Sequence, residues 1–170
     1  MKIVGKYILE YCGEFAKKIK YMEAPAIKFT WRGKENWIMF ASGYNKGSDD
    51  SIRGLTLNGI YFTEINLLQP DFIDQAIRRT ISFEKPFIFA TYNPLGPKHW
   101  FVQDFLNIWQ DEQKRYKDKH WLNFEILKMT DNPALTARQL EEAMLGKDPN
   151  SLGYKRDILG LEVDPSGQVY

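Results

Sequence analysis

The sequence has little of what a metal centre or a disulfide framework needs. Cys12 is the only cysteine, and His99 and His120 are the only histidines. One cysteine excludes a disulfide or a thiolate zinc site within the chain and favours a reducing, cytoplasmic compartment. The histidines lie far apart in sequence without a third ligand nearby, so we interpret them as polar surface groups. We therefore predict no metal site, and we predict that Cys12 is a small buried hydrophobic residue.

Long hydrophobic runs and an excess of one charge are also absent. The apolar run "PFIFA" is far too short to span a bilayer, and the N-terminus lacks the pattern of a signal peptide. The chain has 23 basic and 22 acidic residues, which gives a net charge of +1. This balance predicts neither a protein that coats nucleic acid nor an acid-rich one, so any basic patch must be local.

The apolar content is high enough for a folded core. The chain has 170 residues, of which 44% are hydrophobic and 15% aromatic. That length and composition predict one domain, with or without an appendage, rather than a disordered chain. The first segment predicts a helix over residues 3–22, because apolar residues recur every three or four positions. Next, "AIKFTW" and "NWIMFAS" flank the polar segment Arg32–Glu35 and predict a β-hairpin.

The middle of the chain alternates strand and helix. We predict a strand over Gly59–Thr63, a helix over Gln69–Phe83 and a strand over Pro86–Tyr92, the size of a βαβ unit with parallel strands. Both strands are apolar on both faces, which predicts helices covering each side. The inward residues of the helix are expected to be Phe72, Ile73, Ala76, Ile77 and Ile81.

The remaining chain becomes helical. We predict an aromatic helix over His99–Tyr116 and a further strand over residues 122–130. Thr136 is expected to cap a helix, and Gly160 to stop the last one. The predicted fold class is therefore α/β, a mostly parallel sheet flanked by helices, with a helical C-terminal segment.

Polar residues follow both predicted parallel strands. Thr63 and Glu64 follow "GIYF", and Thr91 and Asn93 follow "PFIFA". Because ligands of open α/β sheets bind at the carboxyl ends of strands, a carboxylate beside hydrogen-bonding groups could hold a water against a phosphate, with Arg53 supplying positive charge. The alternative is structural: Glu64 caps the next helix, Thr91–Asn93 builds a turn before proline, and Arg53 is a solvated loop charge.

Four runs in order bear on this choice: "SIRGLTLNGIYFTEI", "FIFATYNPLGPKHWF", "DNPALTARQLEE" and "YKRDILGLEVDPSGQVY". Together they resemble the large subunit of tailed-phage terminases, the motors that package DNA into capsids, over roughly Ile27 to Tyr170. The resemblance implies the later part of a P-loop NTPase (ASCE/RecA-type) core. It implies a partial ATPase-like α/β domain over residues 1–130 and a helical linker towards a nuclease domain over residues 131–170.

The resemblance also implies roles for individual residues. "GIYFTE" falls on the Walker B strand, with Thr63 at the Walker B position, and Glu64 matches the glutamate that polarises the attacking water. Thr91 and Asn93 fall on the coupling motif, where they would sense the γ-phosphate and transmit hydrolysis to movement. Arg53 matches an arginine that reaches a neighbouring subunit's nucleotide and stabilises charge on the transferred phosphoryl group.

Three departures from the family limit what we expect. No G-x-x-x-x-G-K-[ST] occurs in the sequence, so the phosphate cradle is missing. Thr63 stands where the family usually has an acid, which weakens the indirect hold on magnesium. No clustered aspartates suited to a two-metal nuclease occur either. We expect little or no autonomous ATPase activity, and ATP with Mg²⁺ as cofactors only if a phosphate-binding loop completes the site.

Two functions therefore stand side by side. In the first, the chain is part of a terminase ATPase of a phage or prophage, in the bacterial cytoplasm, with other terminase subunits, portal protein and double-stranded DNA as partners. In the second, it is a non-catalytic prophage remnant that serves as an interaction or structural module. An open edge of the sheet would invite pairing with another chain, so a homo-oligomer or a protective first helix is expected.

Two further clusters are interpreted as structural. Trp100, Phe101, Phe105 and Trp109 recur at helical spacing, which is more typical of a core than of a base-stacking platform. A cationic cluster is interleaved with acids, which is typical of a solvated helix face, with contact to DNA backbone as the alternative. Its members are Lys114, Arg115, Lys117 and Lys119, among Asp111, Glu112 and Asp118.

Overall fold

The structure is a computed structural model that describes residues 10, 16–21, 24–117 and 122–164. The chain divides into two units: one within residues 1–60 together with Leu67–Ile88, the other comprising Tyr61–Asn66 and residues 89–170. The expected division near residue 130, into an ATPase-like part and a linker, stays a prediction.

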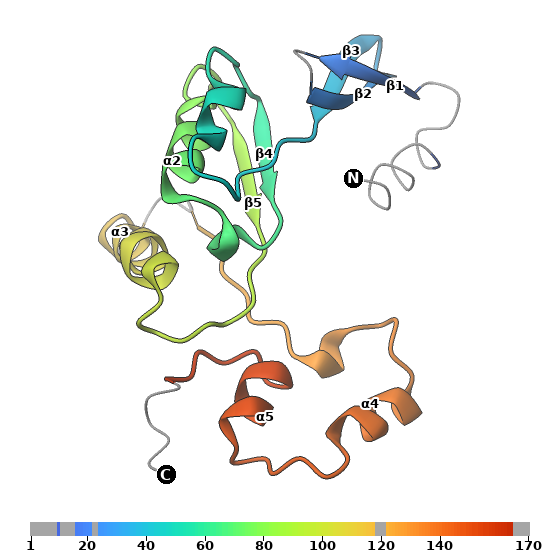
Figure 1. The fold of residues 1–170 in the computed structure, drawn as a ribbon, viewed down its shortest axis with the longest axis vertical. Helices are drawn as coiled ribbons and strands as arrows, with labels where there is room; N and C mark the ends of the chain where they lie inside the picture. The colour runs from blue at the N-terminus through green and yellow to red at the C-terminus, as the bar shows by residue number, and fades with distance from the viewer. Residues whose placement is uncertain (1–9, 11–15, 22–23, 118–121, 165–170) are drawn as a thin grey trace. The chain divides into compact units, whose positions relative to one another are not determined.

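The first unit opens with a three-stranded antiparallel sheet in the order β1-β2-β3 (Figure 1). Its strands are β1 (Ala16–Tyr21), β2 (Ala24–Trp31) and β3 (Lys34–Met39). The predicted hairpin is β2–β3, and its loop is tighter than expected. Arg32 and Gly33 both have positive φ, 51° and 74°, which is the geometry of a two-residue turn matched to the twist of the strands.

The predicted first helix is wrong over Ala16–Tyr21, which forms β1. Its register with β2 runs from Ala16 opposite Phe29 to Tyr21 opposite Ala24, so hydrogen bonding to β2 outweighs the helical spacing of the apolar residues. The Tyr21 ring meets the Trp37 ring edge-on at 5.1 Å, and the lysines of β1 suit an edge strand. The predictions for residues 3–9, 11–15 and 22, Cys12 included, lie outside the described residues.

The middle of the chain contains the predicted strand, helix and strand. They are β4 (Gly59–Phe62), α2 (Pro70–Arg78) and β5 (Phe87–Ala90), with short 3-10 turns η2 (Ser48–Ile52) and η3 (Ile65–Leu67). β4 and β5 form a two-stranded sheet (Figure 1). Backbone bonds from Phe87 N to Asn58 O and from Thr91 N to Phe62 O keep the same offset, so the pair is parallel. The described strands are thus not mostly parallel, since the antiparallel sheet is the larger of the two.

Two details of this βαβ unit differ from expectation. Phe72, Ile73 and Ala76 are buried as predicted, but α2 ends at Arg78, and Ile81 beyond it is 74% exposed. The expectation that β5 is covered on both faces is also wrong: all its residues are exposed, Phe89 to 62%. At Gly59, where β4 begins, a Cβ would lie 2.2 Å from the Phe87 ring, so a larger residue there would displace that ring.

The second unit contains the helical remainder. The predicted aromatic helix is present as a π-helical turn, η4 (Val102–Leu106), followed by α3 (Asn107–Arg115). After it come η5 (Met129–Asp131), α4 (Ala137–Met144) and α5 (Leu152–Asp157). Thr136 caps α4 as predicted, its hydroxyl accepting from Gln139 N at 3.3 Å. Gly160 has a φ of 65°, the conformation expected where the last helix stops.

The strand predicted over residues 122–130 is not formed. Residues 122–128 are irregular, and their side chains are mostly exposed. Two of their backbone amides bond to side chains: Leu122 N donates to Gln113 Oε1 at 2.9 Å, and Lys128 N donates to Asp131 Oδ2 at 2.8 Å. The apolar composition predicted a strand, but no described strand lies beside these residues to form a hydrogen-bonded ladder with them. The prediction is therefore wrong.

Each unit has its own buried side chains. In the first unit they include Ile27, Ile52, Leu55, Phe72 and Ile73. In the second they include Phe62, Ile65, Phe101, Val102, Leu106 and Ile158.

Candidate functional site

The second unit brings the ends of β4 and β5 together around Thr91. Thr91 N donates to Phe62 O at 3.0 Å, and Ile65 N donates to Thr91 O at 2.9 Å. One residue at the end of β5 thus holds the chain on both sides of Thr63 and Glu64. Thr63 and Glu64, the two residues between these bonds, form a bend and are exposed. The predicted pairing of Glu64 with Thr91 therefore follows from the backbone of the parallel strands.

Glu64 has an unusual backbone conformation. Its φ is 50°, in the left-handed region, and it shares this with only one other non-glycine residue of the described chain, Arg32. For a side chain with a Cβ this conformation is strained by roughly 1–2 kcal/mol. Glu64 lies between the two backbone bonds of Phe62 and Ile65 with Thr91, which hold the chain on both sides of it. Strain held by surrounding hydrogen bonds is a feature that functional sites share.

Side chains reinforce the same junction. The Thr91 hydroxyl lies 3.5 Å from Glu64 N, a long contact compared with the backbone bonds. Asn66, only 3% exposed, donates from Nδ2 to Asn93 O at 3.3 Å, while its Oδ1 is buried without a hydrogen-bond partner. Residues 91–96 do not form the turn that the structural alternative required. Sequence reasoning missed Asn66, although a polar residue within "EINLL" was a usable signal.

All four predicted side chains of this junction are exposed: Thr63, Glu64, Thr91 and Asn93. A solvent-facing carboxylate next to hydroxyl and amide groups can orient a water molecule or a phosphate oxygen. A cavity of about 400 Å³ lies elsewhere, in the first unit, and none of the four lines it. Its lining residues are Gly54, Leu55, Thr56, Arg78, Arg79, Ile81 and Ser82.

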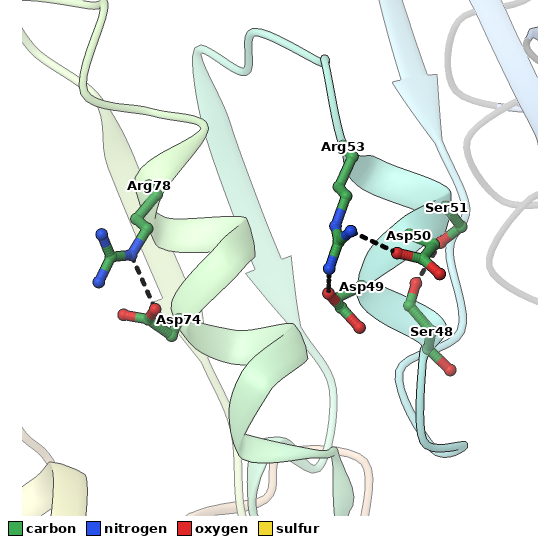
Figure 2. Close-up of polar contacts among 7 residues, drawn as sticks. All are labelled: Ser48, Asp49, Asp50, Ser51, Arg53, Asp74 and Arg78. Atoms are coloured by element: carbon green, nitrogen blue, oxygen red, sulfur yellow. Dashed lines mark hydrogen bonds and ion pairs between the residues drawn. The ribbon is translucent and has the colours of Figure 1, made fainter.

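Arg53 belongs to the first unit and is held by its own loop (Figure 2). Its guanidinium pairs with Asp49 at 2.8 Å and with Asp50 at 3.0 Å, and the side chain is 62% exposed. The hydrogen bond from Asp49, followed by the charges of Asp50 and Asp49, raises the pKa of Arg53 above its usual value. The arginine is therefore a solvated, locally paired charge, and it must release these aspartates to reach any phosphate.

A second carboxylate, which sequence reasoning did not single out, touches the loop after β5. Gly96 N donates to Glu162 Oε2 at 2.7 Å, and Lys98 pairs with Asp164 at 2.9 Å. These contacts join residues that are distant in sequence. No local motif marks Glu162 as a partner of that loop.

The other sequence candidates behave as structural groups. Trp100, Phe101, Phe105 and Trp109 form one cluster of touching rings, with Phe101 only 2% exposed. On α3, Lys114 pairs with Asp111 and Arg115 with Glu112, both at 2.9 Å, so these cations are partly neutralised. Asp118, Lys119 and His120 lie outside the described residues.

Within the described ranges, no three His, Cys, Asp or Glu side chains gather in a way that would hold a metal ion. No described helix is long and apolar enough to cross a membrane.

Comparison with known proteins gives matches among solved structures. No protein-family model and no curated protein matches the chain. Among solved structures it is similar to the large terminase of a thermophilic bacteriophage, with a TM-score of 0.69 and 28% identity over 93% of this chain and 36% of that one. The ADP complex of that terminase gives 0.68 and 27%, over 93% and 36%. Its ATP-γ-S complex gives 0.66 and 27%, over 93% and 34%.

The chain thus spans about a third of the length of the terminase structures that it matches. It resembles part of a phage large terminase, with a mixed α/β fold made of an antiparallel three-stranded sheet and a small parallel pair. The resemblance predicted from the four sequence runs is confirmed at this level.

Proposed function

We propose that the chain acts as part of an ATP-driven motor that packages phage DNA, and that the junction of Glu64, Thr91 and Asn93 is its contribution to the ATP site. The observation that carries the proposal is the pair of backbone hydrogen bonds that Thr91 makes with Phe62 and Ile65. They hold Glu64 at the carboxyl end of a parallel strand pair. The similarity to a large terminase, which forms complexes with ADP and ATP-γ-S, supports the same assignment.

In this proposal each residue acts near the γ-phosphate. Glu64 polarises the attacking water, and Thr91 and Asn93 detect the γ-phosphate through their hydroxyl and amide groups. Thr63, at the Walker B position, contributes a neutral hydroxyl towards a water of magnesium. Arg53 acts on the nucleotide of a neighbouring subunit after leaving Asp49 and Asp50.

The described residues suit only one end of a nucleotide. The junction offers a carboxylate, hydroxyls and an amide, all exposed, but the sequence contains no Lys-Ser/Thr phosphate-binding loop. ATP with Mg²⁺, when bound, would supply the phosphoryl group and the metal charge that this chain lacks. We propose that another polypeptide segment of the motor supplies the loop, with other terminase subunits, portal protein and DNA as further partners.

Calorimetric titration of ATP with Mg²⁺ tests this proposal. The chain alone should bind no nucleotide, and addition of a large-terminase segment that carries a phosphate-binding loop should produce binding and hydrolysis. Glu64→Gln should keep binding and lose hydrolysis, whereas Glu141→Gln, an exposed control on α4, should change neither. No binding or hydrolysis in the wild-type mixture, or hydrolysis that persists in Glu64→Gln, would contradict the proposal.

The second candidate is an interaction module that binds a polypeptide of the packaging machinery without hydrolysing ATP. The exposure of β5 favours it, since Phe87, Ile88 and Phe89 are 50%, 42% and 62% exposed. Apolar strand residues of this kind pair or pack with another chain. If terminase segments bind the chain, Phe89→Lys weakens that binding, and Glu64→Gln has no effect on any activity, this candidate is preferred.

A further inference from the structure

Residues 161–164, which follow α5, are bonded to the loop that follows β5. Glu162 Oε2 accepts a hydrogen bond of 2.7 Å from Gly96 N, and Asp164 pairs with Lys98 at 2.9 Å. Gly96 is buried and has a φ of 104°, a conformation that only glycine adopts readily. The backbone amide of a left-handed glycine therefore meets a carboxylate that lies far away in sequence.

Tyr92 belongs to the same contact. Its ring is half-buried, 5.4 Å from the Phe101 ring and 6.5 Å from the Phe124 ring. Burial raises the pKa of the Tyr92 hydroxyl, and the charge of Glu162 and a hydrogen bond to that carboxylate raise it further. The charge of Glu162 thus acts on the Tyr92 hydroxyl, while its Oε2 accepts from Gly96 N.

The chemistry of these contacts makes them specific. Glu162 Oε1 is shielded from solvent and has no hydrogen-bond partner, so the bond from Gly96 N to Oε2 is what offsets the desolvation of this carboxylate. A hydrogen bond to an ionised acceptor is roughly twice as strong as a neutral one. An exposed surface pair would tolerate movement of the loop, whereas this part-buried one ties the loop to a single position.

The hydrogen bond from Gly96 to Glu162 is the last of three contacts that fix residues 91–96. Thr91 is fixed by Phe62 and Ile65, and the carbonyl of Asn93 is fixed by Asn66. Glu162 holds Gly96, which follows Asn93, and its charge acts on Tyr92, which precedes Asn93. Glu162 is the one of these supports that comes from the segment after α5.

We propose that Glu162 is a positioning residue that sets the conformation of residues 92–96 and fastens this loop to the segment after α5. A second step rests on the proposed function: when nucleotide binds, a change at Thr91 and Asn93 is transmitted through Glu162 to residues 161–164.

The positioning role is tested without nucleotide. In Glu162→Ala, exchange of the Gly96 amide with solvent should accelerate roughly tenfold or more, because a charge-assisted hydrogen bond is lost. Glu162→Gln keeps an acceptor and should restore most of the protection. The tyrosinate absorbance assigned to Tyr92, by difference from Tyr92→Phe, should appear at lower pH in Glu162→Gln than in wild type, because the negative charge is gone.

Glu141→Gln is the matched control and should change neither readout. Unchanged Gly96 exchange in Glu162→Ala, or an unchanged Tyr92 titration in Glu162→Gln, would overturn the positioning role whatever the chain does with ATP. If Glu162→Ala does not fold, the Tyr92 titration in Glu162→Gln decides alone.

The transmission step is tested separately in the mixture that binds nucleotide. There, ATP should change amide exchange at both Gly96 and Leu161 in the wild type, and only at Gly96 in Glu162→Ala. Equal changes at Leu161 in both proteins would overturn transmission through Glu162. Absence of nucleotide binding in the wild-type mixture would instead contradict the proposed function and leave the positioning result standing.

Discussion

The loop around Thr91 and the loop around Arg53 carry the predicted site residues, yet they are held by opposite means. Thr91 is bonded to Phe62 and Ile65, and its loop to Glu162, all distant in sequence. Arg53, 62% exposed, is held by ion pairs with its own neighbours Asp49 and Asp50, whose side chains are 14% and 68% exposed. Exposed pairs contribute little to stability, whereas buried hydrogen bonds are costly to break. The first loop should therefore be rigid and sensitive to substitution, and the second tolerant and free to move.

The largest effect is expected beneath the Thr91 loop. Phe101 is 2% exposed and its ring lies against those of Tyr92, Trp100, Phe105 and Trp109. Phe101→Ala should lower the free energy of unfolding by about 3–5 kcal/mol, measured by denaturant titration, because a large cavity is left.

Phe89→Ala is the control for that substitution, because Phe89 is 62% exposed. Phe89→Ala should lower the free energy of unfolding by well under half as much as Phe101→Ala does. Equal losses would mean that the ring cluster is not the core of the second unit.

A smaller effect is expected at Asn66, which is 3% exposed and donates to Asn93 O. Asn66→Asp replaces that donor with a buried carboxylate facing a carbonyl, which should cost roughly 3 kcal/mol at neutral pH. Burial raises the folded-state pKa of the new carboxyl, so the loss is present above that pKa and is relieved as the pH falls through it. Thermal unfolding across pH, against Asn66→Ala, measures this; a pH-independent loss would argue against burial of the side chain.

The strain at Glu64 predicts an effect of about 1 kcal/mol. Glu64→Gly should be more stable than Glu64→Ala by that amount, because glycine adopts a positive φ without a Cβ clash. The same pair at Thr63, which does not have a positive φ, should show the reverse order. Denaturant unfolding of the four variants provides the comparison, and the same order at both positions would show that Glu64 is not strained.

The smallest effect is expected at Arg53. Arg53→Ala should leave the unfolding midpoint almost unchanged, as should Arg78→Ala, which removes a single pair with Asp74 at 2.7 Å in which both side chains are exposed (Figure 2). Any difference between the two should vanish in high salt, since exposed ion pairs are screened. A distinct loss of stability in Arg53→Ala alone would mean that the Arg53 loop is structural and not free to act on a nucleotide.

Local sequence signals predicted the parts of the fold that depend on neighbouring residues. The β2–β3 hairpin, the Thr136 cap and the burial of Phe72, Ile73 and Ala76 follow from turn, cap and periodicity rules. The rules failed where pairing partners decide the structure: Ala16–Tyr21 became β1 because it pairs with β2, and residues 122–128 formed no strand because no described strand pairs with them.

For the candidate site, the sequence determined which chemical groups stand at the ends of the two strands, Glu64 after "GIYFT" and Thr91 after "PFIFA". Only the tertiary structure decided how they are held. The positive φ of Glu64, the buried Asn66 and the grip of Glu162 on Gly96 all arise from hydrogen bonds between residues far apart in the chain. Local propensity extends over a few residues, whereas these bonds exist only once the backbone has brought their donors and acceptors together.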